Sequence, residues 1–295
     1  MFIADTEISV SGKFFRVAKL RHEWFDFLED PAPFVQGLRD RGVAADLFTF
    51  LQEAHVPHKD YPYHREMVAA SVLTIPSYEA WWDNLHFKAR NKARKARKCG
   101  VQIRAAELND DFVMGVERIY NESPLRQGRK FIHYGKNAAT IKGDLSSFPS
   151  QSLFVGAYLR GQLIGFMKLF QGNEIMRLIH IIATLEQRDT CVMDALIAEA
   201  VKICDEKGIQ HLHYGDWASR GLGAFRAKYN FQRHECPRYF VPLTARGKFM
   251  LNVRLHRPLR ERLPQGWADR LVVIRNQWNI LRYGIARGGN LRRGG

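Results

Sequence analysis

The chain has 295 residues, of which 46% are hydrophobic and only 11 are prolines, so it is long enough for one large or two modest packed domains. No apolar run has the layout of a signal peptide or approaches the ~20 residues that span a bilayer. We therefore expect a globular, cytoplasmic protein. Four cysteines lie far apart without a CxxC pair, which argues against a zinc site and against a disulfide framework.

The formal net charge is +15, and the basic residues gather in two segments. Residues 88–98 contain seven Lys or Arg and no acid, and residues 246–295 contain twelve against Glu261 and Asp269. This clustering predicts a polyanionic partner, which is a coenzyme phosphate, a nucleic acid such as tRNA, or an anionic membrane surface.

Residues 1–76 predict an N-terminal α/β region. Strands are expected at 13–20, 47–51 and 68–74, and Asp30 and Pro31 are typical of a helix start. The histidines His55, His58 and His64 suggest a metal site, but their spacing imposes no geometry, so no metal is predicted.

A long helix is expected over residues 77–99, ended by Gly100. Its apolar residues recur at intervals of three and four and form one stripe, namely Trp82, Leu85, Ala89, Ala93 and Ala96. The basic residues then face outward. Either they form a solvated helix face, or an anion neutralises their mutual repulsion.

The following stretch predicts a second domain at 77–244 and a basic helical extension at 245–295. Strands are expected at 101–106, 153–159, 163–170, 175–183, 209–215 and 232–243, and helices at 110–120, 138–148 and 192–207. Ser219 is expected to cap a further short helix, and the extension has helical patterns at 249–259 and 267–283.

A glycine-broken loop at 121–136 combines hydrogen-bonding side chains with aromatic ones, which is typical of a recognition loop, although an ordinary surface connection has the same composition. We expect substrate binding here and at the end of the 209–215 strand. The residues concerned are Arg126, Arg129, His133, Tyr134, Lys136 and Asp216.

The order of elements between Val101 and Thr244 resembles the GNAT acyltransferase fold. The basic stretch 88–98 with Gly100-Val101, and Tyr214-Gly-Asp216 followed by residues 221–231, are similar to its FemAB-like branch, the aminoacyltransferases that extend peptidoglycan bridges. The resemblance implies an α/β (α+β) fold with a mixed, mostly antiparallel central sheet flanked by helices.

The same resemblance implies an N-acyltransferase that uses acetyl-CoA, another acyl-CoA or an aminoacyl-tRNA as donor, without a metal. The acceptor would be an amine of a small molecule or of a cell-envelope precursor. GNAT enzymes usually carry a glycine-rich turn before the crossover helix, because glycines let backbone N–H groups approach the pyrophosphate. Residues 187–192 contain no glycine, and Asp189 opposes Arg188, so the choice of donor stays open.

Donor binding is expected around the end of the 175–183 strand and the start of the next helix. The predicted donor-binding residues are Ile182, Ala183, Gln187, Arg188, Thr190, Cys191 and Val192. Glu186 is the predicted base, acting directly or through a water. The tyrosine that often acts as general acid in the family is either replaced by Phe225 or displaced to Tyr229, and His180 is a further catalytic candidate. Cys191 sits at a helix start, a position that can lower the pKa of a thiol, but plain packing is the favoured interpretation.

Two other functions remain open. The first is a catalytically degenerate GNAT scaffold that binds RNA or tRNA through the basic helix at 88–98. In the second, residues 245–295 attach the protein peripherally to an anionic membrane. The sequence does not predict the oligomeric state.

Overall fold

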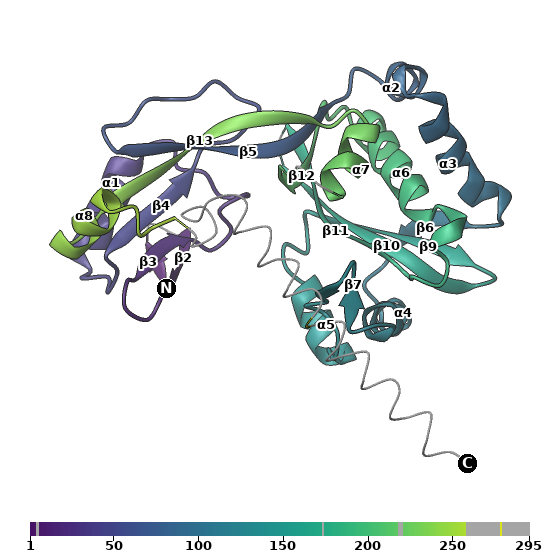
Figure 1. Ribbon diagram of the computed structural model, residues 1–295, viewed down its shortest axis with the longest axis horizontal. Helices are drawn as coiled ribbons and strands as arrows, with labels where there is room; N and C mark the ends of the chain where they lie inside the picture. The colour runs from purple at the N-terminus through teal and green to yellow at the C-terminus, as the bar shows by residue number, and fades with distance from the viewer. Residues whose placement is uncertain (4–5, 173, 218–220, 258–277, 279–295) are drawn as a thin grey trace, which may run out of the picture. The chain divides into compact units, whose positions relative to one another are not determined.

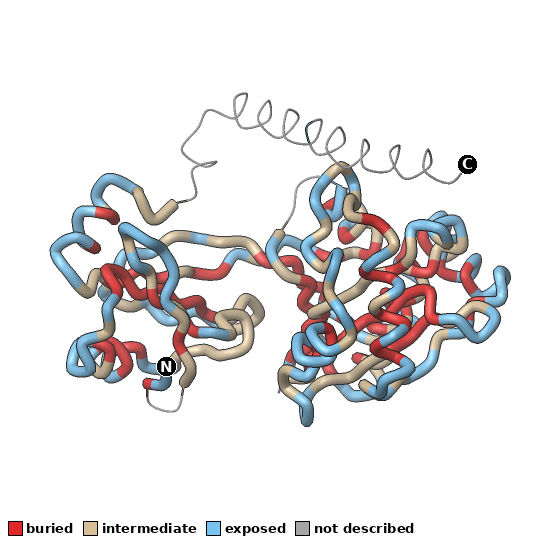
Figure 2. Tube along the Cα trace, turned by 90° about the horizontal axis from the view of Figure 1, so that it is seen from below, coloured by how far each residue is buried: buried red, intermediate tan, exposed pale blue. Residues whose placement is uncertain are grey.

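The computed structural model describes residues 1–3, 6–172, 174–217, 221–257 and 278 (Figure 1). Of these, unit 1 contains the residues within 1–72, 216–223 and 232–262, and unit 2 those within 73–215, 224–231 and 263–295. Buried stretches lie inside each unit (Figure 2). The expected division at 76 and 244 differs from this one, because the strand that ends near 244 belongs with the N-terminal strands.

Unit 1 is built on a mixed sheet. Its strands are β1 (Phe2–Ile3), β2 (Thr6–Ser11), β3 (Val17–Leu20), β4 (Leu47–Leu51), β13 (Gln232–Pro242) and β5 (His64–Thr74). Neighbours in this order pair antiparallel except β3 and β4, which are parallel. β13 lies between β4 and β5, so residues 1–72 cannot form the sheet alone.

Helix α1 (Pro31–Asp40) covers this sheet. Asp30 caps it by accepting the Ala32 N–H at 3.0 Å, as the sequence predicts. Phe34 of α1 packs on Phe48 of β4. The strand expected at 13–20 begins only at Val17, because the chain turns at Gly12, whose φ is +103° and where a Cβ would collide with the carbonyl of Phe15.

Unit 2 contains the three antiparallel strands and the crossover that the sequence predicts. The sheet order is β6 (Gln102–Ala106), β9 (Ser152–Leu159), β10 (Gln162–Gln171), β11 (Ile175–Ala183) and β12 (His211–Asp216). Only β11 and β12 are parallel, and α6 (Val192–Glu206) joins them. The mixed, mostly antiparallel sheet flanked by helices is therefore confirmed.

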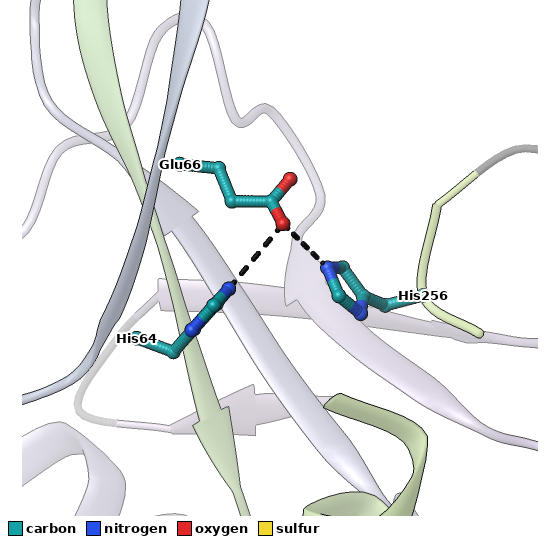
Figure 3. A group of neighbouring side chains, drawn as sticks. All are labelled: His64, Glu66 and His256. Carbon is teal, nitrogen blue, oxygen red and sulfur yellow. Dashed lines mark hydrogen bonds and ion pairs between the residues drawn. The ribbon is translucent and has the colours of Figure 1, made fainter. Parts of the chain in front are cut away.

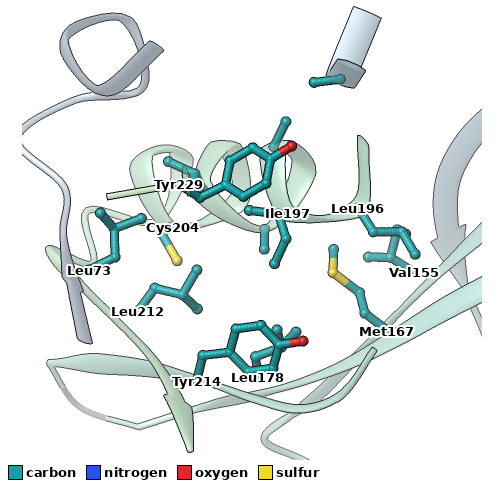
Figure 4. Packing of buried hydrophobic residues seen from close by; sticks show 14 of the residues in the cluster. Leu73, Val155, Met167, Leu178, Leu196, Ile197, Cys204, Leu212, Tyr214 and Tyr229 are labelled. Atoms are coloured by element: carbon teal, nitrogen blue, oxygen red, sulfur yellow. The ribbon is translucent and has the colours of Figure 1, made fainter. Parts of the chain in front are cut away.

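Helices cover both faces of this sheet (Figure 1). On one face α3 (Phe87–Lys98) and α6 close the larger core, where Leu196 and Ile197 of α6 lie near Met167 of β10 (Figure 4). On the other face α4 (Asp110–Asn121) and α5 (Ala138–Leu145) close a second core that includes Phe112 and Phe166.

The helix expected over 77–99 is two helices, α2 (Tyr78–Asn84) and α3. Leu85 interrupts them with an extended backbone (ψ 140°) and turns its side chain into the core, and His86 then caps α3 by accepting the Lys88 N–H. As a result Trp81 is the buried tryptophan, whereas Trp82 is only partly buried. The alanine stripe Ala89, Ala93 and Ala96 is buried as expected.

Several other predicted elements differ from the structure or fall outside the described residues. The helix expected at 138–148 ends at Leu145, and the 121–136 loop contains a short hairpin of β7 (Leu125–Arg126) and β8 (Arg129–Lys130). Helix α8 spans Ala245–Asn252, earlier than the expected 249–259. Ser219 and the pattern at 267–283, apart from Trp278, lie outside the described residues. No described helix has the length and apolarity needed to cross a membrane.

Candidate functional site

Strands β11 and β12 part within the sheet of unit 2. They pair only at Ile175–His211, Met176–Leu212 and Arg177–His213. Directly beyond this point β11 contains a bulge, because Lys168 faces His180 while Leu169 faces Leu178, so Ile179 is the extra residue. Among the strands that the structure describes, none pairs with the edge of β11 that faces away from β10 between Leu178 and Ala183.

The bulge changes which side chains face each side of the sheet. Before it, Met176 and Leu178 face the core under α6, and after it Ile181 and Ala183 do. Ile182 packs on the opposite side, in the core under α4 and α5. A single inserted residue shifts the alternation by one, so His180 also turns toward the α4 and α5 side, where its ring lies 6.5 Å from Phe166.

His180 and His133 form the centre of a titratable cluster, with ring centroids 5.6 Å apart. His133 also stacks on Tyr120 at 4.4 Å. Burial, and then the charges of His133, Lys168 and Lys136, lower the pKa of His180 to about 4. Burial and Lys136 likewise lower the pKa of His133. Both rings are therefore held neutral near pH 7.

Ion pairs and hydrogen bonds surround these histidines. Lys136 Nζ lies 2.6 Å from Asp144 Oδ2 and 3.3 Å from His133 Nδ1, so the Lys136 ammonium donates to Nδ1 and the proton of the neutral His133 ring resides on Nε2. Neither ring nitrogen of His180 has a hydrogen-bond partner among the described residues. His180 therefore has a free acceptor nitrogen.

Lys168 of β10 is a site residue that the sequence did not reveal. Its side chain is fully buried, and Nζ donates to Leu145 O at 2.7 Å and to Ser147 O and Oγ at 2.7 and 2.8 Å. Burial lowers the pKa of Lys168 to about 8. It holds the C-terminal end of α5, the helix that carries Asp144. A lysine inside an apolar strand was the only sequence signal for it.

Arg126 and Glu122 secure the turn that follows β11. Arg126 donates to Ala183 O at 2.6 Å and to Ile119 O at 2.9 Å. Glu122, which the sequence did not single out, accepts the N–H groups of Leu185 and Glu186 at 2.7 and 2.8 Å. Arg126 and Glu122 thus fix the backbone at the end of β11 and in the turn after it. The side chain of Glu186 stays exposed beside this end of the strand.

The predicted donor-binding residues divide between two elements. Ile182 and Ala183 belong to β11, and Ile182 packs under α4 and α5, whereas the start of α6 holds the other five, Gln187, Arg188, Thr190, Cys191 and Val192. A 3₁₀ turn (Arg188–Thr190), preceded by Gln187, leads to Cys191, whose φ of 59° lies in the left-handed region. Burial and the Asp194 carboxylate raise the pKa of Cys191, although Lys95 and Lys92 of α3 act in the opposite direction. The helix start is thus flanked by α3 lysines, and the side chain of Val192 is buried.

Tyr229 points its hydroxyl at Asp194 of α6. The ring is fully buried, the hydroxyl donates to Asp194 Oδ1 at 2.6 Å, and Lys228 pairs with the same carboxylate oxygen. Burial, followed by this hydrogen bond, raises the pKa of Tyr229. Tyr229, which follows α7 (Leu222–Lys228), therefore connects the end of that helix to α6, and its role as general acid stays a prediction.

The remaining predicted substrate-binding residues are placed differently. Arg129 and Tyr134 are exposed on the 121–136 loop. Asp216 is the exposed last residue of β12 and is grouped with unit 1.

The outward face of α3 is basic, as predicted. Arg90 pairs with Asp83 at 3.6 Å. No carboxylate among the described residues lies within ion-pairing distance of the other basic side chains of α3, which are Lys88, Lys92, Arg94, Lys95, Arg97 and Lys98. This surface carries a positive charge that the described part of the chain does not neutralise.

Neither the known protein-family models nor the curated protein sequences include a match to this chain. Solved structures do match it. The chain is similar to L-PGS from Bacillus licheniformis (TM-score 0.54, 15% identity, 79% of this chain and 80% of that chain). It is also similar to the C-terminal domain of a putative lysylphosphatidylglycerol synthetase from Agrobacterium fabrum (TM-score 0.54, 13% identity, 83% of each chain).

A tandem GNAT protein from the clavulanic acid biosynthesis pathway matches more loosely (TM-score 0.48, 12% identity, 80% of this chain and 78% of that chain) and adds nothing to the assignment. The similarities to L-PGS and to the Agrobacterium fabrum domain concern the fold. The chain has a GNAT/FemAB-like fold.

Proposed function

We propose that unit 2 transfers an acyl or aminoacyl group from an activated donor to an amine of a small molecule or cell-envelope precursor. The observation that carries this proposal is the parting of β11 from β12 at the Ile179 bulge, beside the neutral His180. The unpaired edge of β11 offers backbone N–H groups to a carbonyl oxygen, and such groups stabilise the negative charge that develops during acyl transfer.

The chemistry begins with attack of the amine nitrogen on the donor carbonyl carbon. The new C–N bond forms, and a ring nitrogen of His180 accepts the proton that the amine loses. The bond to the donor sulfur or oxygen then breaks, and the leaving group takes up a proton. Glu186, exposed at the end of β11, is the second candidate base.

The donor is expected to carry phosphates. The charges of Lys92 and Lys95 act on Cys191 at the start of α6, and neither lysine has an ion-pair partner in the described part of the chain, so both are available to a phosphate near this helix N-terminus. The turn lacks glycine, and Asp194 lies within the first helical turn, which weakens the case for a coenzyme A pyrophosphate. The name lysylphosphatidylglycerol synthetase, which belongs to a protein of the same fold, describes an aminoacylated lipid and so favours an aminoacyl group and an envelope acceptor.

To test the proposal, the full chain is incubated with a panel of amines and either labelled acyl-CoA thioesters or charged tRNA, and consumption of the donor is measured. We expect one donor class to be consumed. His180→Gln is expected to lower kcat by about 100-fold or more, and His58→Gln, an exposed histidine of unit 1, to leave it unchanged. Lys92→Glu with Lys95→Glu is expected to raise the donor KM, whereas Lys207→Glu at the other end of α6 is not.

Two results would contradict the proposal. Full activity of the His180 variant would remove the proposed base. Salt-sensitive RNA binding without consumption of any donor would favour a degenerate scaffold that uses α3 to bind nucleic acid.

A further inference from the structure

Three potential metal ligands converge in unit 1, far along the chain from one another. His64 and Glu66 lie two residues apart on β5, so their side chains point to the same face of the sheet. His256 follows α8 (Figure 3). Glu66 Oε1 lies 2.7 Å from His256 Nε2 and 3.3 Å from His64 Nε2. The three ligand atoms all lie within 4.8 Å of one another.

The surroundings hold the cluster in place. The side chain of His256 is 1% exposed and its ring lies 4.7 Å from that of Phe240, the residue that pairs with His64 across β13 and β5. The side chain of His64 is 45% exposed, so one side of the cluster is open to solvent. Rigid ligands on one side and access on the other are what an ion needs in order to enter and be retained.

We propose that His64, Glu66 and His256 bind a divalent transition-metal ion of the Zn²⁺ class. Two imidazoles and one carboxylate are ligands that zinc accepts, with water in the fourth position. An ion about 2.1 Å from each ligand in tetrahedral geometry separates the ligand atoms by about 3.4 Å. The 3.3 Å between His64 and Glu66 is close to that value, whereas the 2.7 Å between His256 and Glu66 is a hydrogen bond that has to widen when the ion enters.

Arg257 gives the proposal a specific consequence. Its Nε donates to the same oxygen of Glu66 at 2.9 Å, and its side chain is 35% exposed. The guanidinium therefore balances the carboxylate charge at the place a metal ion would take. An incoming ion has to displace it, so removal of Arg257 is expected to strengthen metal binding.

A bound ion would join residues 253–257 to β5 and so fix the chain segment that follows α8. None of its ligands belongs to the histidine cluster of unit 2. The proposal therefore stands or falls independently of the transfer reaction.

The experiment titrates Zn²⁺ into the full, untagged chain after removal of metal with a chelator, and follows binding by calorimetry. We expect one ion per chain. His64→Ala, Glu66→Gln and His256→Ala are each expected to weaken binding at least tenfold, and Arg257→Ala to tighten it. His58→Ala and Cys99→Ser, which remove an exposed histidine and an exposed thiol elsewhere, serve as matched controls and should bind like the wild type.

Zn²⁺ is also expected to raise the melting temperature of the wild type but not that of Glu66→Gln, a substitution that preserves shape. Comparing metal-free melting temperatures separates lost binding from lost folding. Failure of the wild type to bind micromolar Zn²⁺ would overturn the proposal. Unchanged one-to-one binding by all three ligand variants would overturn it as well.

Discussion

At the scale of single residues, the environment of His180 shows how position decides chemistry. An imidazole on an exposed strand titrates near its ordinary pKa of 6.5, whereas this one lies beside His133 and near two lysines in a core. Desolvation and like charges both favour the neutral ring. Because burial and these charges act only in the folded chain, the lowered pKa of His180 makes the free energy of unfolding depend on pH.

Because the pKa of His180 is lower in the folded chain, the unfolded chain binds more protons between about pH 6.5 and about pH 4. Stability should therefore fall as the pH decreases through this window. Across the window this loss of stability amounts to roughly 3 kcal/mol, because each unit of pKa shift corresponds to about 1.4 kcal/mol. His180→Gln should abolish this pH-dependent loss. Urea denaturation at a series of pH values measures it.

His58→Gln, which changes an exposed histidine, is the control and should keep the slope of the wild type. Equal slopes for the wild type and His180→Gln would show that His180 is not held neutral by the fold.

At the scale of elements, close packing determines where the helices lie. Gly115 of α4 faces Leu163 of β10, and a Cβ added at Gly115 would lie 2.8 Å from Leu163 Cδ2. The absence of a side chain lets α4 lie directly on the sheet, next to the histidine cluster. Gly143 of α5 is exposed and would meet nothing within 4 Å.

These two glycines give a matched prediction. Alanine favours a helix over glycine by about 1 kcal/mol, so Gly143→Ala should stabilise the protein by roughly 0.5 to 1 kcal/mol. Gly115→Ala should destabilise it by roughly 1 to 2 kcal/mol, because the cost of overpacking exceeds that gain. Chemical denaturation of both variants tests the difference, and stabilisation by Gly115→Ala would refute the tight packing of α4.

At the scale of the whole molecule, the two units differ in how the chain builds them. The described part of unit 2 lies within residues 73–231 except for Trp278, and only 216–223 interrupt it. Unit 1 combines the N-terminal strands with β13, which lies between β4 and β5. The N-terminal region expected from the sequence therefore lacks the strand that joins its own sheet.

Separate fragments should reflect this difference. A fragment of residues 73–231 is expected to unfold cooperatively, whereas residues 1–76 are expected to show no cooperative transition, because β4 and β5 have no common neighbour without β13. Circular dichroism during thermal and urea denaturation makes the comparison. A cooperative transition in the 1–76 fragment would contradict this expectation, because it would show that the paired strands β1 to β4 form a stable fold without β13.

Local sequence patterns were sufficient to predict most of the strands and helices of unit 2. Alternation and turn residues predicted β9, β10, β11 and the crossover to β12, and the alanine spacing predicted the buried stripe of α3, because such signals depend on neighbours in sequence. Charge clustering predicted the basic face in the same way. The element order was sufficient to predict the GNAT-like sheet.

Only the tertiary structure decided the rest, because it depends on contacts between residues far apart in sequence. The Ile179 bulge, which sets the direction of His180, arises from pairing with β10. Tyr229 became a buried partner of Asp194, and Lys168 was found to hold α5, through contacts that no local pattern contains. His64, which the sequence grouped with His55 and His58, instead lies beside Glu66 and His256, because β5 and the segment after α8 meet only in the folded chain.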